Sequence, residues 1–153
     1  MNWKFILFFL VTIQSYSQTN NIQYLSFKHE YSGIVRDDVL ISFSFSENFN
    51  YVTVKYSIKN KTRHTKKIPA EKFDAICLVL KQVSIGDLMD NFSFGLDLPT
   101  TIVSFGEIPN DITLRIWGLD SDTVNKPTGY IKFIEAIEMI LATIDTSLDE
   151  INK

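Results

Sequence analysis

The segment Val39–Lys59, VLISFSFSENFNYVTVKYSIK, decides the fold. Hydrophobic residues alternate with mostly polar ones on both sides of its centre at Asn48-Phe49, which is the period-two pattern of two half-buried strands. A tight turn at Asn48-Phe49 opposes each apolar residue with another, whereas a one-residue slip would turn one strand inside out. The predicted pairs are Val39 with Ile58, Ile41 with Tyr56, Phe43 with Val54, and Phe45 with Val52.

Two further strands are predicted on either side of this hairpin. Residues Ile22–Tyr31 read as a strand with Leu25 and Phe27 on its inner face. Residues Thr62–Ile68 are polar and basic, which is typical of an edge strand whose charges discourage pairing with other sheets.

In two segments the spacing of the hydrophobic residues is that of a helix instead of a strand. Pro69 suits the first position of a helix, and Pro127 suits the start of a second one. The first helix is expected to bury one stripe of residues: Phe73, Ile76, Cys77, Leu80 and Val83. The stripe expected on the second is Tyr130, Ile134, Ile137, Leu141 and Ile144.

The segment Thr100–Gly118, TTIVSFGEIPNDITLRIWG, predicts a second hairpin with Pro109-Asn110 at the centre of its turn. This turn pairs Phe105 with Leu114 and Val103 with Ile116 on one face, and Ile102 with Trp117 and Ser104 with Arg115 on the other. Two interpretations stay open for the mixed face. It is either the outer side of a hairpin that covers the core, or a ligand or partner patch formed by Ile102, Ser104, Arg115 and Trp117.

These elements predict an α+β fold: a mostly antiparallel, twisted sheet of five or six strands with two helices packed on one face. The segment from Asp87 to Pro99 shows no clear period and is expected to be a loop. The tail from Asp145 to Lys153 is expected to fray.

The first residues have the pattern of a secretory signal peptide. Lys4 precedes the largely apolar segment Phe5–Ile13, and the small residues Ser15 and Ser17 stand before a predicted cut between Ser17 and Gln18. The apolar segment is well short of the roughly 20 residues that a membrane-spanning helix needs, so a permanent membrane span is the weaker alternative.

Cleavage would leave residues 18–153 as a single α+β domain after the signal peptide 1–17. Cys77 is the one cysteine, so the domain has no internal disulfide, and a chain of this size buries enough surface to fold without one. An exported protein without disulfides is ordinary for bacteria, and we expect a secreted or periplasmic bacterial protein.

The common local motifs of catalysis and cofactor binding do not occur in the sequence. His29 and His64 fall on separate predicted strands and are expected at the strand surface. Cys77 falls on the buried stripe of a helix, where it acts as a small hydrophobic residue. We therefore assign no catalytic, cofactor-binding or metal-binding residue.

Charge is unevenly distributed along the chain. Residues 55–72 contain seven cations and one acid, Glu71, although the whole chain has a net charge of −3. The basic candidates for an interaction patch are Lys55, Lys59, Lys61, Arg63, Lys66 and Lys67. They are either a protected edge or a docking site for an acidic protein or a polyanionic envelope surface. The acidic total and the predicted export argue against nucleic acid as a partner.

Three segments resemble a class of small exported bacterial domains of unknown function: KKIPAEKFDAICLVL, GLDLPTTIVSF followed by a hairpin, and PTGYIKFIEAIEMIL. The resemblance covers about residues 51–145. It implies the same kind of fold and an exported location, and it carries no catalytic residue.

Three functions follow as hypotheses. The first is an exported, non-catalytic binding protein of the cell envelope or exterior, with its partner and oligomeric state open. The second is a periplasmic inhibitor or immunity protein against a secreted toxin or hydrolase. The third is an enzyme, which would need a pocket where His29 or His64 meets an acid and a hydroxyl.

Overall fold

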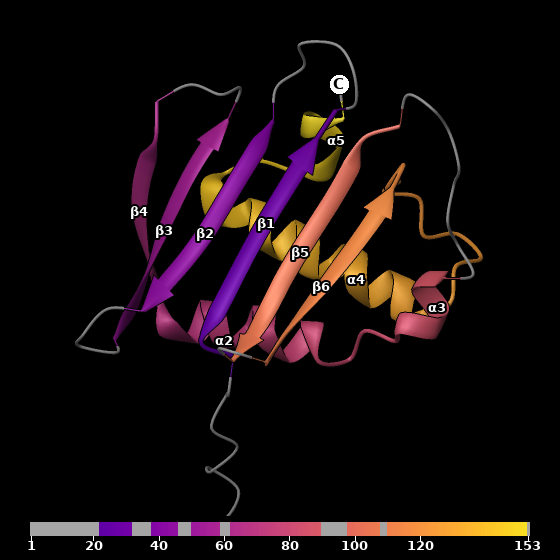
Figure 1. The fold of residues 1–153 in the computed structure, drawn as a ribbon, viewed down its shortest axis with the longest axis horizontal. Helices are drawn as coiled ribbons and strands as arrows, with labels where there is room; N and C mark the ends of the chain where they lie inside the picture. The colour runs from indigo at the N-terminus through magenta and orange to yellow at the C-terminus, as the bar shows by residue number, and fades with distance from the viewer. Residues whose placement is uncertain are drawn as a thin grey trace, which may run out of the picture.

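In the computed structural model, six antiparallel strands form one sheet with the order β4-β3-β2-β1-β5-β6 (Figure 1). The structure describes residues 22–31, 38–45, 50–58, 62–89, 98–107 and 110–152. The strands are β1 (Tyr24–Glu30), β2 (Val39–Phe45), β3 (Tyr51–Ile58), β4 (His64–Pro69), β5 (Thr100–Glu107) and β6 (Asn110–Trp117). The helices are α2 (Ala70–Leu80), α3 (Ile85–Met89), α4 (Thr128–Leu141) and α5 (Leu148–Ile151), with a 3₁₀ turn at Ala142–Ile144. The predicted α+β class is confirmed.

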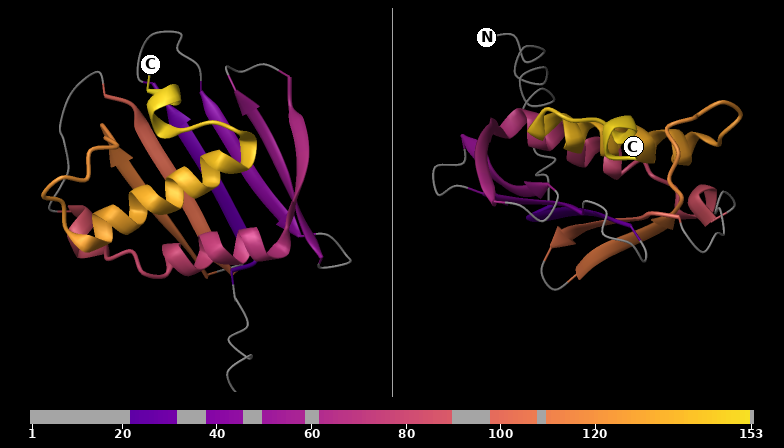
Figure 2. Two further views of the ribbon diagram at one scale, coloured as in Figure 1. Left: turned by 180° about the vertical axis from the view of Figure 1, so that it is seen from behind. Right: turned by 90° about the horizontal axis from the view of Figure 1, so that it is seen from above.

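The two long helices, α2 and α4, pack side by side on one face of the sheet, as predicted (Figures 1 and 2). The core lies between this helix layer and the sheet, where Phe27, Phe73 and Phe133 are fully buried. These helices do not cover the opposite face of the sheet (Figure 2). We call this the helix-free face.

The predicted register of the first hairpin is confirmed. β2 and β3 pair Val39 with Ile58, Ile41 with Tyr56, Phe43 with Val54, and Phe45 with Val52. Alternation excludes a shift of one residue, and the predicted turn centre at Asn48-Phe49 selects this register from those two residues apart.

The predicted register of the second hairpin is wrong by two residues. β5 and β6 pair Val103 with Leu114 and Phe105 with Ile112, and Asn110 lies opposite Glu107 in the ladder. Asn110 is therefore a strand residue rather than part of the turn. A two-residue shift leaves every side chain on its predicted face, and both registers oppose apolar residues, so alternation cannot distinguish them.

β1 is a central strand that pairs with β2 on one side and β5 on the other. Leu25 and Phe27 are buried, as predicted, but the prediction for His29 is wrong. His29 has no exposed surface, because it shares the inward parity of Leu25 and Phe27 under the helix layer.

The helix starts are close to those expected. Pro69 is the last residue of β4 and the N-cap of α2, so the helix starts at Ala70, one position after the predicted start. Pro127 caps α4 in the same way. α4 buries more than one stripe, including Phe133, Ala136 and Ile140, because it packs against α2 as well as the sheet.

Two short helices occupy segments where none was predicted. α3 lies at the start of the segment expected to be a loop, and α5 lies in the tail expected to fray. Ser147 and Glu150 form a reciprocal capping box at α5, and Leu148 is fully buried. A capped turn with a buried leucine is held in place, so the tail does not fray at α5. The signal peptide and its cut lie outside the described residues.

Candidate functional site

The helix-free face is rich in hydroxyl groups. One row of cross-strand neighbours runs over all six strands and contains five hydroxyl residues and one lysine. From β4 to β6 the row is Thr65, Lys55, Ser42, Ser26, Ser104 and Thr113. The hydroxyls of Ser104 and Thr113 lie 2.8 Å apart. Alternation in the strands places this row opposite the core, so the face is polar and wetted.

The next row combines cations with apolar side chains. Its residues, from β3 to β6, are Ser57, Leu40, Lys28, Ile102 and Arg115. Leu40 is 39% exposed, although its neighbours in the sequence, Val39 and Ile41, are in the core. This row therefore offers both charge and an apolar contact on one surface.

The structure places the four predicted patch residues of the second hairpin on the helix-free face. Ile102 lies opposite Arg115, Ser104 lies opposite Thr113, and Trp117 lies opposite Thr100. Trp117 is 40% exposed, so the closing helix does not cover it. The four residues share a face, but their pairings differ from the predicted ones because of the shifted register.

The predicted basic segment is divided between the two sides of the sheet. Lys66 is on the side of the helices, where its Nζ lies 2.7 Å from Oδ2 of Asp145. Lys67 has the opposite parity, and its Nζ lies 4.1 Å from the centre of the Tyr51 ring. The ion pair with Lys66 lowers the pKa of the Asp145 carboxyl. Lys59 and Lys61 lie outside the described residues.

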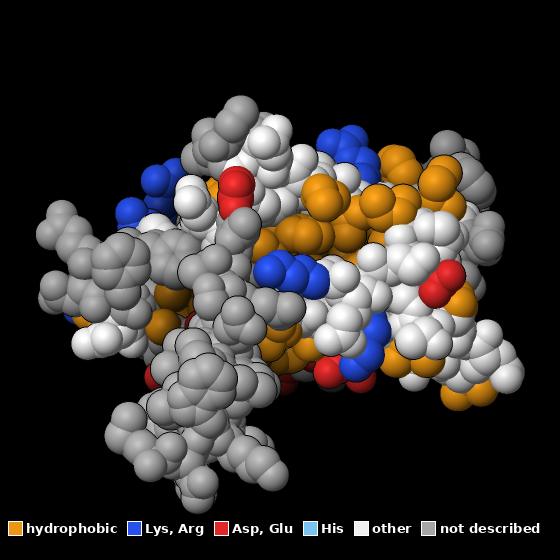
Figure 3. Space-filling model, turned by 90° about the horizontal axis from the view of Figure 1, so that it is seen from below, with side chains coloured by type: hydrophobic (Ala, Val, Ile, Leu, Met, Phe, Trp, Pro, Cys, Tyr) orange, Lys and Arg blue, Asp and Glu red, His pale blue; other side chains and the backbone are white. Residues whose placement is uncertain are grey.

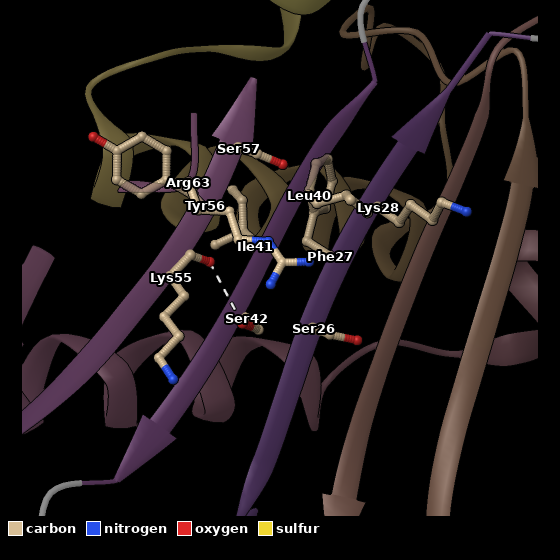
Figure 4. Close-up of a pocket in the computed structure, with 10 residues that line it drawn as sticks. All are labelled: Ser26, Phe27, Lys28, Leu40, Ile41, Ser42, Lys55, Tyr56, Ser57 and Arg63. Atoms are coloured by element: carbon tan, nitrogen blue, oxygen red, sulfur yellow. Dashed lines mark hydrogen bonds between the residues drawn. The ribbon is translucent and has the colours of Figure 1, made fainter. Parts of the chain in front are cut away.

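Lys55 and Arg63 meet at a hollow on the helix-free face (Figure 4). The hollow has a volume of about 390 Å³ and spans β1, β2 and β3, with Arg63 reaching in from the residue before β4. Figure 4 shows the Arg63 side chain lying across the strands toward β2. The polar side chains that line it are Ser26, Lys28, Ser42, Lys55, Ser57 and Arg63, and Leu40 supplies an apolar wall.

The hollow carries uncompensated positive charge. Within the described ranges, neither Lys55 nor Arg63 has an ion-pair partner. Lys28 differs from them, because it pairs with Glu30 on its own strand. Free cations beside an apolar wall can bind a carboxylate or phosphate without first breaking an internal ion pair.

Hydroxyl groups add hydrogen-bond donors to this charge. Ser57 is 8% exposed, and its hydroxyl has no hydrogen-bond partner among the residues that the structure describes. Ser42 makes one long bond of 3.5 Å to the Lys55 carbonyl, and Ser26 accepts a bond of 2.8 Å from Tyr24. The lining therefore presents mainly donors, which suits an anionic ligand.

The two histidines do not converge. His29 is enclosed in the core, with Nδ1 2.8 Å from Thr101 Oγ1, and its Nε2 is buried without a partner in the described part of the chain. Burial lowers its pKa to about 4, against a smaller opposing effect of Asp38. His64 is exposed on β4, as predicted, and stacks on Tyr56 at 5.3 Å between ring centres. A residue with no exposed surface cannot reach a substrate, so His29 is structural in this conformation.

Among the described residues, the other reactive side chains are buried or do not come together in a group. Cys77 is buried, as predicted from its stripe on α2. In the described ranges, no three His, Cys, Asp or Glu side chains come together as metal ligands would. The same ranges contain no helix long and apolar enough to cross a membrane.

The residues that the sequence analysis missed are Ser26, Lys28, Leu40, Ser42 and Ser57. The sequence contained a signal for three of them. Alternation in the predicted first hairpin places Leu40, Ser42 and Ser57 on the same side of the sheet as Lys55. What the alternation could not provide is the placement of β1 beside β2, which brings Ser26 and Lys28 to the same hollow. No protein-family model matches the chain, and a search of curated proteins found no match.

Proposed function

We propose that the protein is an exported, non-catalytic binding protein that holds an acidic segment of a partner protein in the hollow between β1, β2 and β3. The observation that carries this proposal is the meeting of Lys55 and Arg63, without ion-pair partners in the described structure, beside the apolar side chain of Leu40. Charged and apolar groups together suit a peptide that alternates carboxylates with apolar side chains.

An acidic protein fits this face better than a long polyanion does. Glu30 and Asp111 also lie on the helix-free face, because they have the parity of Lys28 and Arg115 in β1 and β6. A polymer with a charge at every unit would meet these carboxylates as well as the cations. A short acidic segment can contact the hollow alone.

A second, more specific function is compatible with the same surface. An inhibitor or immunity protein against a secreted toxin or hydrolase would use the same rigid surface to cover an acidic site on its target. The strands that line the hollow are fixed by the sheet, which lowers the entropy lost when a partner binds.

Binding is tested with defined probes. A synthetic Glu- and Leu-containing peptide, a polyphosphate of equal charge and anionic lipid vesicles are each titrated against the full chain at low and moderate salt. We expect the peptide to bind most tightly, and its affinity to fall with added salt. Tighter binding of polyphosphate or vesicles would contradict a protein partner and favour an envelope surface.

A matched pair of variants tests the site. Lys55→Glu with Arg63→Glu reverses two charges in the hollow, whereas Lys72→Glu with Lys81→Glu makes the same change in net charge at exposed positions on and just after α2. The first pair is expected to weaken peptide binding at least about 10-fold, which is roughly 1.4 kcal/mol, and the second to leave it nearly unchanged. Equal losses would show that only total charge matters and would refute the hollow as the site.

Export is tested separately. Mass spectrometry of the protein from its natural source is expected to find Gln18 as the first residue and the protein outside the cytosol. An intact Met1 in the cytosol would refute export without bearing on the hollow.

A further inference from the structure

The two edges of the sheet differ in how they are protected. β4 forms one edge and carries Lys66, Lys67 and His64, charged or polar groups that discourage pairing with another sheet. β6 forms the other edge, is eight residues long and ends in Ile116 and Trp117. No described strand pairs with the outer side of β6, so the outward backbone groups of its middle residues, Asp111 to Arg115, offer a template for another strand.

We propose that β6 pairs antiparallel with β6 of a second copy of the chain, about a two-fold axis at Thr113. Asp111 and Arg115 lie two residues on either side of Thr113 and share the helix-free face with it. Antiparallel pairing about Thr113 therefore opposes Asp111 with Arg115 of the second copy, and Arg115 with its Asp111. Within the described residues, neither side chain has an ion-pair partner in its own chain.

The opposite side of the strand is complementary in the same register. Ile112 is 47% exposed although it has the parity of the buried Leu114 and Ile116. Pairing about Thr113 places Ile112 opposite Leu114 of the second copy, so an exposed apolar side chain gains an apolar neighbour. Figure 3, which views the molecule from below, shows hydrophobic side chains exposed at several places on this end of the described structure.

Other registers lose this match. A shift of one residue would oppose the polar side of one strand with the apolar side of the other. A shift of two residues opposes Asp111 either with Thr113 or with Trp117, and in both cases Asp111 no longer meets Arg115. The two-fold arrangement also closes on itself, as homodimer interfaces do.

The paired copies would form one continuous sheet of twelve strands with both helix-free faces on the same side. Each dimer would carry two hollows, so a partner with two acidic segments would bind by avidity. The dimer is inferred from β6 alone, so this proposal does not depend on whether the hollow binds an acidic protein.

A charge exchange tests the register. Dimerisation of the full chain is measured by sedimentation equilibrium at protein concentrations up to about 1 mM, which is high enough to detect a weak dimer. Circular dichroism checks that each variant is folded. Arg115→Asp and Asp111→Arg each place like charges opposite one another, and each is expected to weaken dimerisation at least about 10-fold. The double variant Asp111→Arg/Arg115→Asp restores opposite charges and is expected to restore the dimer. A wild-type chain that stays monomeric, or a folded double variant that does not recover, would overturn the proposal.

Crosslinking tests the position of the axis. Opposed residues of an antiparallel pair have Cβ atoms about 4.5–5.5 Å apart, so Thr113→Cys places two thiols within reach of a short thiol crosslinker. Cys77 is buried and does not compete. Thr65→Cys, exposed on the same face of β4, is the matched control. Crosslinked dimers are expected for Thr113→Cys alone. Equal crosslinking of both variants, or crosslinks in a mixture of the two that join β6 to β4, would overturn the two-fold pairing.

Discussion

Nδ1 of His29 and Oγ1 of Thr101 lie 2.8 Å apart inside the core, where the two residues face each other across β1 and β5. Both side chains have no exposed surface. The imidazole is therefore held as a neutral group, because burial disfavours its charged form more than the negative charge of Asp38 favours it.

Stability should fall in mild acid because of His29. Its pKa is lowered from 6.5 to about 4 by burial, so below pH 6.5 the unfolded chain takes up a proton that the folded chain resists. Above pH 6.5 His29 is neutral in both states and does not lower the free energy of unfolding. Between pH 6.5 and about 4 the free energy of unfolding falls because of His29, by at most about 1.4 kcal/mol per pH unit.

Urea unfolding between pH 8 and pH 4 measures this effect. His29→Gln is expected to reduce the pH dependence, and His64→Gln, at an exposed position, to leave it unchanged. All three proteins have the same carboxylates, so the comparison isolates the imidazole of His29. Identical pH profiles of the wild-type chain and His29→Gln between pH 7 and pH 5 would contradict the prediction.

The start of α4 is capped from another helix. Pro127 provides no side-chain cap, and the Gly129 amide instead donates a 2.8 Å hydrogen bond to Oδ2 of Asp87 in α3. Asp87→Ala removes both this acceptor and a negative charge at the helix start, and it is expected to cost about 1 kcal/mol in the free energy of unfolding. Asp87→Asn keeps an acceptor and should cost less. Chemical denaturation measures both variants. An unchanged free energy of unfolding for Asp87→Ala would show that the cap does not stabilise the protein.

Gly106 is required by the geometry of the second hairpin. Its φ is +147°, and a Cβ at this position would lie 2.5 Å from the Asn110 carbonyl oxygen. Gly106→Ala is expected to cost more than about 2 kcal/mol, because backbone strain adds to a clash with backbone. Gly86→Ala in α3 is the control: its Cβ would meet only Ser84 Oγ at 3.8 Å, so its stability should stay the same or rise slightly. Similar losses in the two thermal melts would argue against this geometry.

The C-terminal turn should contribute to stability. Leu148 is fully buried, and α5 is tied to the rest of the protein by the bond of 2.6 Å from the Tyr31 hydroxyl to the Ile151 carbonyl. Leu148→Ala is expected to cost roughly 2–5 kcal/mol. Ile131→Ala, at an exposed position of α4, should cost well under half of that. If Leu148→Ala left the free energy of unfolding in urea unchanged, the tail would not be part of the folded unit.

How much of each hairpin could be predicted depended on where its turn was placed. Alternation determines which side chains face the core, but registers two residues apart satisfy it equally well. The turn predicted at Asn48-Phe49 gives the observed pairing of β2 with β3, whereas the turn predicted at Pro109-Asn110 gives a pairing of β5 with β6 that is shifted by two residues. The tail contained a usable signal, since Ser147 and Glu150 have the spacing of a capping box.

The candidate site was only partly predictable for a related reason. Runs of lysine in the sequence suggest one patch, but adjacent strand residues point to opposite faces, which separates Lys66 from Lys67. Strand order adds the rest of the hollow, and it depends on contacts between distant segments. The prediction for His29 is wrong because it follows the usual preference of histidine for the surface, whereas His29 lies on the same inward side of β1 as Phe27.

The position of β1 between β2 and β5 has a consequence for synthesis. The ribosome makes β1 first and β5 much later, so a nascent chain that has completed β1 to β4 still exposes one whole edge of its central strand. Non-local pairing of this kind is slow, and an open edge in that interval invites aggregation. Fragments that stop before Thr100 should therefore need a chaperone to stay in solution, rather than forming a stable half-domain.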